Sequence, residues 1–213
     1  MVEIIPTIIT QNVVDLAKKL ALVEDYVEWV HVDIMDGNFV KQETFRDPIR
    51  LRSVNTKAKI ELHLMVWEPE KTMHQWVGTG AKRFVIHFES TYKRKELAEQ
   101  LKESGLQSAL AVNPETPYEF IEEYVPSFDM IQVMTVKPGL GGQEFMEDML
   151  PKIKSLRRRF PNKPISVDGG INPVTAKKAI DVGANVLLAG SFIYKHKNIK
   201  EGLEELKMAV SGS

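Results

Sequence analysis

The sequence predicts an α/β fold of the (β/α)8 type, a TIM barrel, and three observations support this prediction. Short runs rich in Val and Ile alternate with longer stretches of helical periodicity along the whole chain, which is the pattern of repeated βα units. Eight such units fit into 213 residues, slightly below the usual length of a TIM barrel. No GxGxxG motif follows the first strand, which disfavours the main alternative, a doubly wound open sheet.

The eight units predict strands and helices in strict alternation. The strands are expected near residues 2–9, 27–34, 59–65, 82–88, 107–112, 128–135, 164–168 and 185–189. The helices are expected near residues 12–23, 47–53, 69–79, 93–104, 117–123, 145–160, 173–183 and 198–209. Pro69, Pro117 and Pro173 support three helix starts, because the first N–H groups of a helix have no partner within it.

The chain shows no internal division and no unusual composition. Neither a linker nor a low-complexity tract interrupts it, so we expect one domain over residues 1–210 and a flexible tail at 211–213. A hydrophobic content of 43% and a net charge of −1 are typical of a globular protein and give no reason to expect a nucleic acid partner. The basic run at 154–160 is explained by the exposed face and last turn of a helix.

Some classes of protein are disfavoured by what the sequence lacks. The chain contains no cysteine, which excludes a disulfide scaffold and a thiolate metal site. Its first residues do not form a secretory signal, and no apolar run is long enough to span a membrane. We therefore expect a cytoplasmic location and no membrane partner.

Ionisable residues interrupt the second predicted strand, WVHVDIM. Because side chains alternate along a strand, Val30, Val32 and Ile34 are expected to face the helices, and His31 and Asp33 the opposite side. Burying such a pair without partners costs several kcal/mol, very roughly. The pair is therefore a solvated strand end, a satisfied core pair or a functional site.

Further polar residues end other predicted strands. His63 ends the third strand, His87 the fourth and Asp168 the seventh. In TIM barrels the active site lies at the C-terminal ends of the strands. His31, Asp33, His63 and Asp168 together would form a cluster that suits Zn²⁺, Fe²⁺, Mn²⁺ or Co²⁺. For any one of them alone, a polar strand end with a satisfied hydrogen bond explains the residue equally well.

Two aspartates on different strands also suit acid–base chemistry. Entering from different sides of the barrel, they can reach opposite faces of a flat carbon acid. A metal between them would stabilise an enediolate oxygen. This arrangement fits epimerisation next to a carbonyl group.

Three glycine-bearing loops follow the last three predicted strands. They are KPGLGGQEF at 137–145, DGGINP at 168–173 and AGSF at 189–192. Glycine lets backbone N–H groups approach an anion, and the loops after strands seven and eight are the usual phosphate site of a TIM barrel. Three such loops at one end of the barrel favour a phosphate ligand.

The motifs HVDIMDGNFV, HLMV, NPETP, VMTVKPGLGGQEF, VDGGI and LLAGSFIY resemble, in order and spacing, those of the ribulose-phosphate 3-epimerase family. The resemblance covers nearly the whole chain. It implies an isomerase of the pentose phosphate pathway that interconverts D-ribulose 5-phosphate and D-xylulose 5-phosphate. It also implies one divalent metal ion per subunit, with Zn²⁺ or Fe²⁺ ahead of Mn²⁺ or Co²⁺, and a homo-oligomer, either a dimer or a hexamer.

The resemblance implies a role for particular residues of this chain. Asp33 and Asp168 would be catalytic, and both would bind the metal together with His31 and His63. Methionines that surround the reacting carbons would be Met35, Met65 and Met134. Substrate contacts would come from Thr7, His63, Gly139, Leu140, Gly141, Gly142, Gly169, Gly170, Gly190 and Ser191.

The chain departs from the family pattern mainly in two places. Thr7 replaces a serine and Asn12 an aspartate near the first strand, and Asn38, Lys41 and Gln42 lie in an altered loop after the second strand. These departures leave the substrate preference open.

Three alternative functions remain open on sequence grounds. A six-carbon ketose phosphate such as allulose 6-phosphate could be the substrate of the same reaction. A phosphate-binding lyase, either a decarboxylase or an aldolase that uses Lys59 or Lys137, belongs to another reaction class. A binding module without turnover is the last alternative.

Overall fold

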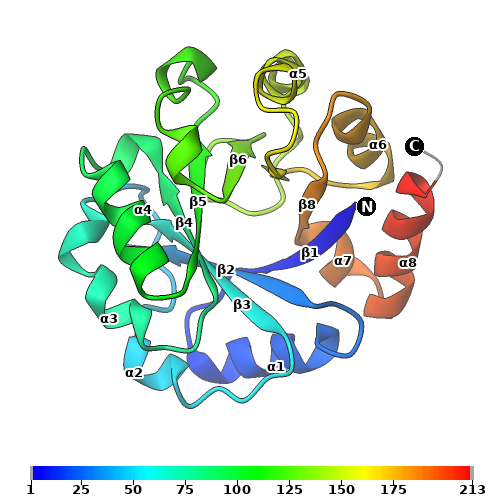
Figure 1. Ribbon diagram of the computed structural model, residues 1–213. Coiled ribbons are helices and arrows are strands. Elements are labelled where there is room, and N and C mark those ends of the chain that lie inside the picture. Colours follow the sequence, from blue (N-terminus) through cyan, green and yellow to red (C-terminus); the bar gives the residue numbers. More distant parts are fainter. Residues whose placement is uncertain (1, 212–213) are drawn as a thin grey trace.

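Eight parallel strands form a closed barrel in the computed structural model, which describes residues 2–211 (Figure 1). Each strand pairs with the next one in sequence, and β8 pairs with β1. The predicted TIM barrel is therefore confirmed. The strands are β1 (Glu3–Ile8), β2 (Trp29–Met35), β3 (Lys59–Met65), β4 (Arg83–His87), β5 (Gln107–Val112), β6 (Met130–Met134), β7 (Ile165–Asp168) and β8 (Val186–Ala189).

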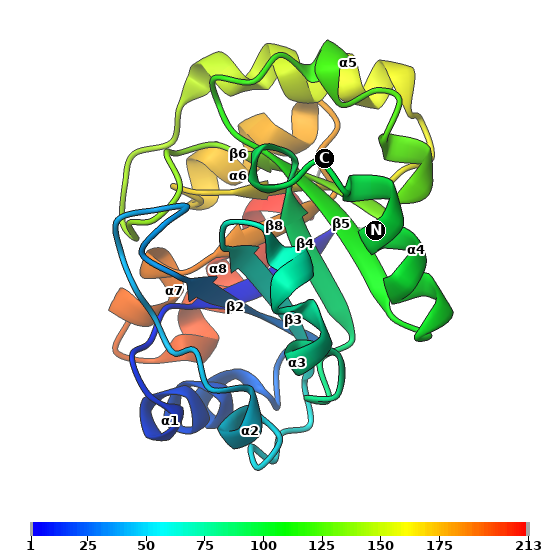
Figure 2. The ribbon, with the colours of Figure 1, turned by 90° about the vertical axis from the view of Figure 1, so that its left-hand side faces the viewer.

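Helices surround the barrel on its outside, as the two ribbon views show (Figures 1 and 2). The α-helices of the described residues are α1 (Val13–Val23), α2 (Pro48–Leu51), α3 (Met73–Val77), α4 (Arg94–Glu103), α5 (Leu150–Arg159), α6 (Pro173–Asp181), α7 (Ser191–Lys195) and α8 (Ile199–Val210). Ser211 directly follows α8, and the rest of the tail expected at 211–213 lies outside the described residues.

Every predicted strand is present, but two of the helix predictions differ from the structure and one helix was not predicted. The helix expected at 117–123 is wrong, because the segment forms 3-10 turns at Tyr118–Phe120 and Val125–Ser127; Pro126 has no backbone N–H to donate, so an α-helix cannot continue through it. The helix expected at 69–79 is divided into a 3-10 turn, Pro69–Lys71, and α3. The short helix α7 was not expected, since five residues carry no helical period of their own.

The alternation of side chains along the strands separates two hydrophobic clusters. Val30, Val32 and Ile34 belong to the large cluster between the strands and the helices, as predicted. A small cluster fills the rest of the inside of the barrel, next to the polar residues described below. Its members are Ile5, Trp29, Val85, Ala109, Ala111, Met130, Val186 and Leu188.

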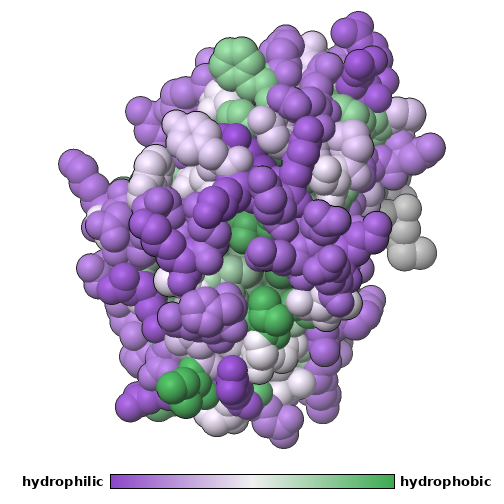
Figure 3. Space-filling view, turned by 60° about the vertical axis from the view of Figure 1, so that its left-hand side comes forward, coloured by the Kyte–Doolittle hydropathy of each residue, from purple (hydrophilic) through white to green (hydrophobic). Residues whose placement is uncertain are grey.

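The surface is largely polar on the face that Figure 3 draws, where hydrophobic side chains appear only in small separate groups. Among residues 2–211, no helix combines the length and the apolar character that crossing a membrane requires.

The loop after β7 is held by a complete capping box at the start of α6. The Asn172 side chain accepts hydrogen bonds from the N–H groups of Val174 and Thr175, at 2.9 and 3.1 Å. The Thr175 hydroxyl accepts one from the N–H of Asn172 at 2.9 Å. This box connects the glycine-bearing loop at 168–173 to a rigid helix.

Replacing the capping side chain should destabilise the protein. We expect Asn172→Ala to lower the free energy of unfolding by about 1 kcal/mol, because two backbone N–H groups lose their acceptor. Urea unfolding checks this, and Asn172→Asp, which keeps an acceptor, should retain the stability of the wild type. An alanine variant as stable as the wild type would show that the box is not needed.

Candidate functional site

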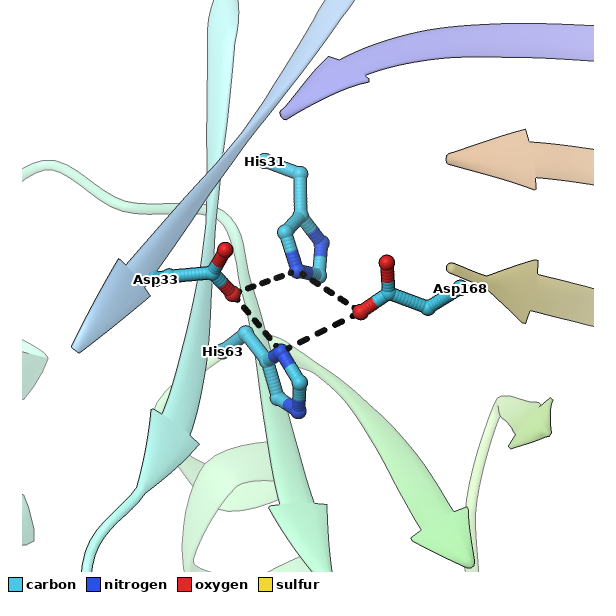
Figure 4. Close-up of side chains that lie close together, drawn as sticks. All are labelled: His31, Asp33, His63 and Asp168. Carbon is cyan, nitrogen blue, oxygen red and sulfur yellow. Dashed lines mark hydrogen bonds and ion pairs between the residues drawn. The ribbon is translucent and has the colours of Figure 1, made fainter. Parts of the chain in front are cut away.

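Four side chains meet inside the C-terminal end of the barrel (Figure 4). His31 and Asp33 come from β2, His63 from β3 and Asp168 from β7. One potential ligand atom from each lies within 4.8 Å of all the others. The Asp33 carboxylate is 2.9 Å from His63 Nδ1 and 3.3 Å from His31 Nε2. The structure therefore brings together all four residues of the predicted cluster.

The donor atoms of this cluster fit a divalent cation. His31 Nε2 is buried without a hydrogen-bond partner, although it faces carboxylate oxygens of Asp33 and Asp168 at 3.3 and 3.8 Å. Two imidazole nitrogens and two carboxylates suit Zn²⁺, Fe²⁺, Mn²⁺ or Co²⁺. A cation among them would give the orphaned nitrogen and both carboxylates a common partner.

A buried ion pair lies behind His31. Glu61 Oε1 lies 2.5 Å from His31 Nδ1, and its other oxygen accepts a hydrogen bond from Arg83 Nε. The Arg83 guanidinium also packs 4.1 Å from the centre of the Trp29 ring. A proton on Nδ1 donated to Glu61 leaves the Nε2 lone pair directed toward the cluster, which is the tautomer that a metal ligand needs.

The charges of the cluster are strongly coupled. Burial alone would lower the pKa of His31, but the hydrogen bonds to Asp33 and Glu61 outweigh it and raise this pKa to about 10. Without a cation, a proton on His31 therefore supplies the positive charge that the neighbouring carboxylates require.

The two aspartates have opposite pKa shifts. Burial disfavours the charge of Asp33, but hydrogen bonds from His31 and His63 prevail and hold its pKa well below the usual range. Burial raises the pKa of Asp168 to about 7. The charge of His31 lowers this pKa, whereas repulsion from Asp33 and Glu61 raises it further. Near neutral pH one carboxyl group is thus ionised while the other exchanges its proton readily.

Two threonines fix the strand ends that carry the aspartates. The Thr44 hydroxyl donates to the carbonyl of Asp33 and accepts from the N–H of Met35, both at 2.8 Å. The Thr135 hydroxyl donates to the carbonyl of Gly169 at 2.7 Å, and the backbone N–H of Thr135 donates to the carbonyl of Asp168 at 2.8 Å. The backbone that carries each aspartate is therefore fixed by a threonine, in addition to the contacts that each carboxylate makes with other side chains.

A cavity of about 530 Å³ opens above the cluster. Asp33 and Asp168 line it, whereas His31 and His63 lie fully buried behind them. The residues expected to contact the substrate line it as well, except His63. They are Thr7, Gly139, Leu140, Gly141, Gly142, Gly169, Gly170, Gly190 and Ser191.

Three methionines form an apolar wall beside the aspartates. Met35 and Met65 end β2 and β3, and Met134 ends β6. All three are almost fully buried and line the cavity.

Two glycines of the loops are required by close approach. A Cβ at Gly170, where φ is +67°, would lie 2.4 Å from the backbone nitrogen of Phe145. A Cβ at Gly190 would lie 2.3 Å from Thr7 Oγ1. Backbone rather than side chains therefore faces the cavity at both places.

The altered loop after β2 lies at the mouth of the cavity. Gln42 reaches the loop after β6 so closely that a Cβ at Gly139 would lie 2.4 Å from its Oε1. The Asp36 carboxylate accepts hydrogen bonds from the N–H groups of Asn38, Phe39 and Trp67, at 2.8 to 2.9 Å. Lys41 and Gln42 share a neighbouring pocket with Pro138 and Leu140, which also line the cavity. Asn12 only caps α1 by accepting from the N–H of Asp15.

Several residues of the site were given no role from the sequence. His87 ends a strand, yet only the structure shows that its Nε2 contacts His63 Nε2 at 2.8 Å. Gln132 donates to Asp168 Oδ2 at 3.3 Å. A signal was available, because Glu61 and Gln132 stand two residues before His63 and Met134 on the same inward faces. Lys19, Tyr194 and Lys195 also line the cavity, without any motif to indicate them.

The lysines weighed for a Schiff base lie elsewhere. Lys59 is at the N-terminal end of β3 and pairs with Glu28 at 2.5 Å. Lys137 is largely exposed and lies 3.8 Å from Glu115. Neither lysine lines the cavity above the cluster, which disfavours an aldolase built on them.

Comparison with known proteins places these features in a family context. A family model described as "Ribulose-phosphate 3 epimerase family" matches residues 3–194. The ribulose-phosphate 3-epimerase of Eremothecium gossypii is 41% identical over 192 residues, which cover 84% of this chain and 80% of the relative. That of Schizosaccharomyces pombe is 36% identical over 214 residues, covering 98% of this chain and 93% of the relative.

Solved structures of other enzymes share the fold. The 3-hexulose-6-phosphate synthase of Salmonella typhimurium superimposes with a TM-score of 0.73 at 14% identity, covering 99% of each chain. At this identity the likeness shows the fold alone.

The raised pKa of Asp168 predicts a specific pH dependence of stability. Between about pH 4 and pH 7 the folded metal-free protein holds a proton that the unfolded chain has released, so folding loses stability as the pH rises. As the pH rises through this window, the free energy of unfolding of the wild type should fall relative to that of Asp168→Asn. Above the window, the difference between the two should stay constant. Urea unfolding in the presence of a chelator measures this. A difference that does not change with pH would contradict the assignment.

Proposed function

This chain belongs to the ribulose-phosphate 3-epimerase family, and we propose that Asp33 and Asp168 are the acid and base with which it interconverts D-ribulose 5-phosphate and D-xylulose 5-phosphate. One observation carries this proposal. Two carboxyl groups reach the floor of one cavity from opposite sides of the cluster (Figure 4), and their pKa values are shifted in opposite directions. Such a divergence is typical of an acid–base pair.

The two aspartates exchange roles during the reaction. For one epimer, the ionised carboxylate takes the proton from C3, and the C–H electron pair passes into the C2 carbonyl to give an enediolate. The other carboxyl group then delivers its proton to C3 from the opposite face, which inverts the centre. The pair ends with its protonation states reversed, which is the starting state for the other epimer.

The four cluster residues would hold the divalent cation. His31, Asp33, His63 and Asp168 are its proposed ligands, with Zn²⁺ or Fe²⁺ as first candidates and Mn²⁺ or Co²⁺ as alternatives. When bound, the cation supplies Lewis-acid stabilisation of the negative charge that develops on the substrate oxygens. The orphaned His31 Nε2 supports this assignment.

The rest of the cavity suits a sugar phosphate. The glycine loops at its far end are proposed to bind the phosphate through backbone N–H groups and the Ser191 and Thr7 hydroxyls. Met35, Met65 and Met134 are proposed to keep water away from the reacting carbon. These side chains are apolar and line the same cavity as both carboxylates, which supports that role.

The chain is further proposed to act as a homo-oligomer, either a dimer or a hexamer. An apolar surface hollow, lined by Val13, Val14, Ala17 and Ala21 of α1 and by Val54, would suit a contact between copies and supports this proposal. The cytoplasmic location stays a prediction from the sequence.

Removing either acid should stop epimerisation without unfolding the protein. We expect Asp33→Asn and Asp168→Asn each to lower kcat by about 100-fold to 10,000-fold or more, since each removes one proton transfer. Turnover of ribulose 5-phosphate and uptake of deuterium at C3 in heavy water measure the effect. Exchange without net inversion would show that only one acid still works.

A matched control for these variants is Asp181→Asn, at an exposed position of α6, which should leave turnover unchanged. Near-normal turnover in either active-site variant would exclude the mechanism with two aspartates.

Removing the metal should abolish the activity reversibly. We expect a chelator to eliminate turnover and Zn²⁺, Fe²⁺, Mn²⁺ or Co²⁺ to restore it, because the enediolate loses its Lewis acid. Metal content and turnover are measured on the same samples. Full activity in a sample shown to be free of metal would contradict the role of the cation.

A further inference from the structure

His63 is connected to a second buried histidine on its far side. His63 Nε2 lies 2.8 Å from Nε2 of His87, which comes from the neighbouring strand β4. Both rings are fully buried, and Phe39 of the loop after β2 packs against His87 with ring centres 4.7 Å apart. Two nitrogens at this distance share one proton, so one ring donates and the other accepts.

Among residues 2–211, His87 Nε2 is the nearest hydrogen-bond partner of His63 Nε2. The Gln132 side-chain nitrogen lies 3.4 Å away, but an amide nitrogen only donates, and it donates to Asp168 Oδ2 at 3.3 Å. Which nitrogen of the His63 ring carries the proton therefore depends on His87.

His87 is in turn aligned with a carboxylate. Its Nδ1 and the Glu89 Oε2 atom are both buried without a hydrogen-bond partner, and they lie 3.5 Å from each other. The other oxygen of Glu89 accepts hydrogen bonds from the N–H of Asn113 at 2.9 Å and from the Thr116 hydroxyl. A proton on His87 Nδ1 satisfies both orphaned atoms, whereas a lone pair there would face the carboxylate and be repelled.

We propose that Glu89 and His87 are positioning residues, which fix His63 in the tautomer that carries its proton on Nε2. Glu89 accepts the Nδ1 proton of His87, and His87 Nε2 accepts the Nε2 proton of His63. The lone pair of His63 Nδ1 is then free for a cation. This inference rests on the metal site of the proposed function and extends it by two residues.

The relay has a competitor within the cluster. His63 Nδ1 lies 2.9 Å from Asp33 Oδ1, so in the absence of a cation Asp33 favours a proton on that nitrogen. A cation must displace this proton, and the competing arrangement places a His87 lone pair against Glu89. Glu89 therefore lowers the cost of the tautomer that binds metal. Partners of this kind behind a histidine ligand typically change metal affinity by about 10-fold to 100-fold.

The proposal is tested by the affinity for Zn²⁺, measured against a competing chelator. We expect His87→Phe, which keeps an aromatic ring but removes the acceptor, to weaken binding by about 10-fold to 100-fold. His87→Gln, which can place an amide oxygen near the lost Nε2, should recover part of this loss. Glu89→Gln should weaken binding as well. Glu70→Gln is the matched control, since Glu70 accepts from the Thr91 hydroxyl at 2.7 Å outside the relay.

A second readout is the protonation of the histidine rings, followed by nitrogen NMR of the Zn²⁺-loaded protein. The chain has five histidines, so the signals can be assigned by substitution. We expect His87 to carry its proton on Nδ1 in the wild type. A proton on Nε2 of His87, or unchanged affinity in both His87→Phe and Glu89→Gln, would overturn the relay.

Failure of the metal site itself would look different. A wild-type protein that binds no Zn²⁺, or an Asp168→Asn variant that binds it as tightly as the wild type, would overturn the proposed ligands. A wild type that binds Zn²⁺ tightly together with relay variants that bind it equally well would overturn the relay alone. Thermal unfolding of each variant separates loss of affinity from loss of fold.

Discussion

The architecture of the site depends on the repulsion between two carboxylates, Asp33 and Asp168, that share a buried position. Each of them lies within 4 Å of both His31 and His63, and the pair cannot stay fully ionised there without a compensating charge. A proton on His31 supplies that charge in the metal-free protein, and a divalent cation would supply it more directly. The charge balance extends deeper into the barrel, because His31 also contacts the buried Glu61, which pairs with Arg83.

Parallel strands were predictable because their periodicity is local and strong. In β2, alternation alone placed His31 and Asp33 opposite Val30 and Val32, and the structure agrees. The helix prediction for 117–123 failed because the nearby Pro126 acts through the backbone and leaves the apolar spacing of the segment intact. Helix α7 was missed because five residues after Gly190 depend on tertiary contacts for their structure.

The candidate site was predictable in its four cluster residues and in most of its cavity lining. Strand ends and motifs pointed to both sets, and the structure brings them together. Glu61, Arg83 and Glu89 contact other side chains of the site; alternation places Glu61 on the inward face, but no local pattern shows which side chain each of the three contacts. Their contacts depend on strand register. Glu61 lies beside His31 because β2 and β3 pair with these two residues opposite each other.

The hydrogen bonds of Thr44 and Asp36 make the loop after β2 structurally independent of the strand end that carries Asp33. They fasten both ends of the loop after β2 to the barrel, so substitutions between them do not disturb the aspartate below. Substitutions at Asn38, Lys41 and Gln42 would therefore alter the surface beside the cavity through a single loop, while the backbone that carries Asp33 keeps its own support.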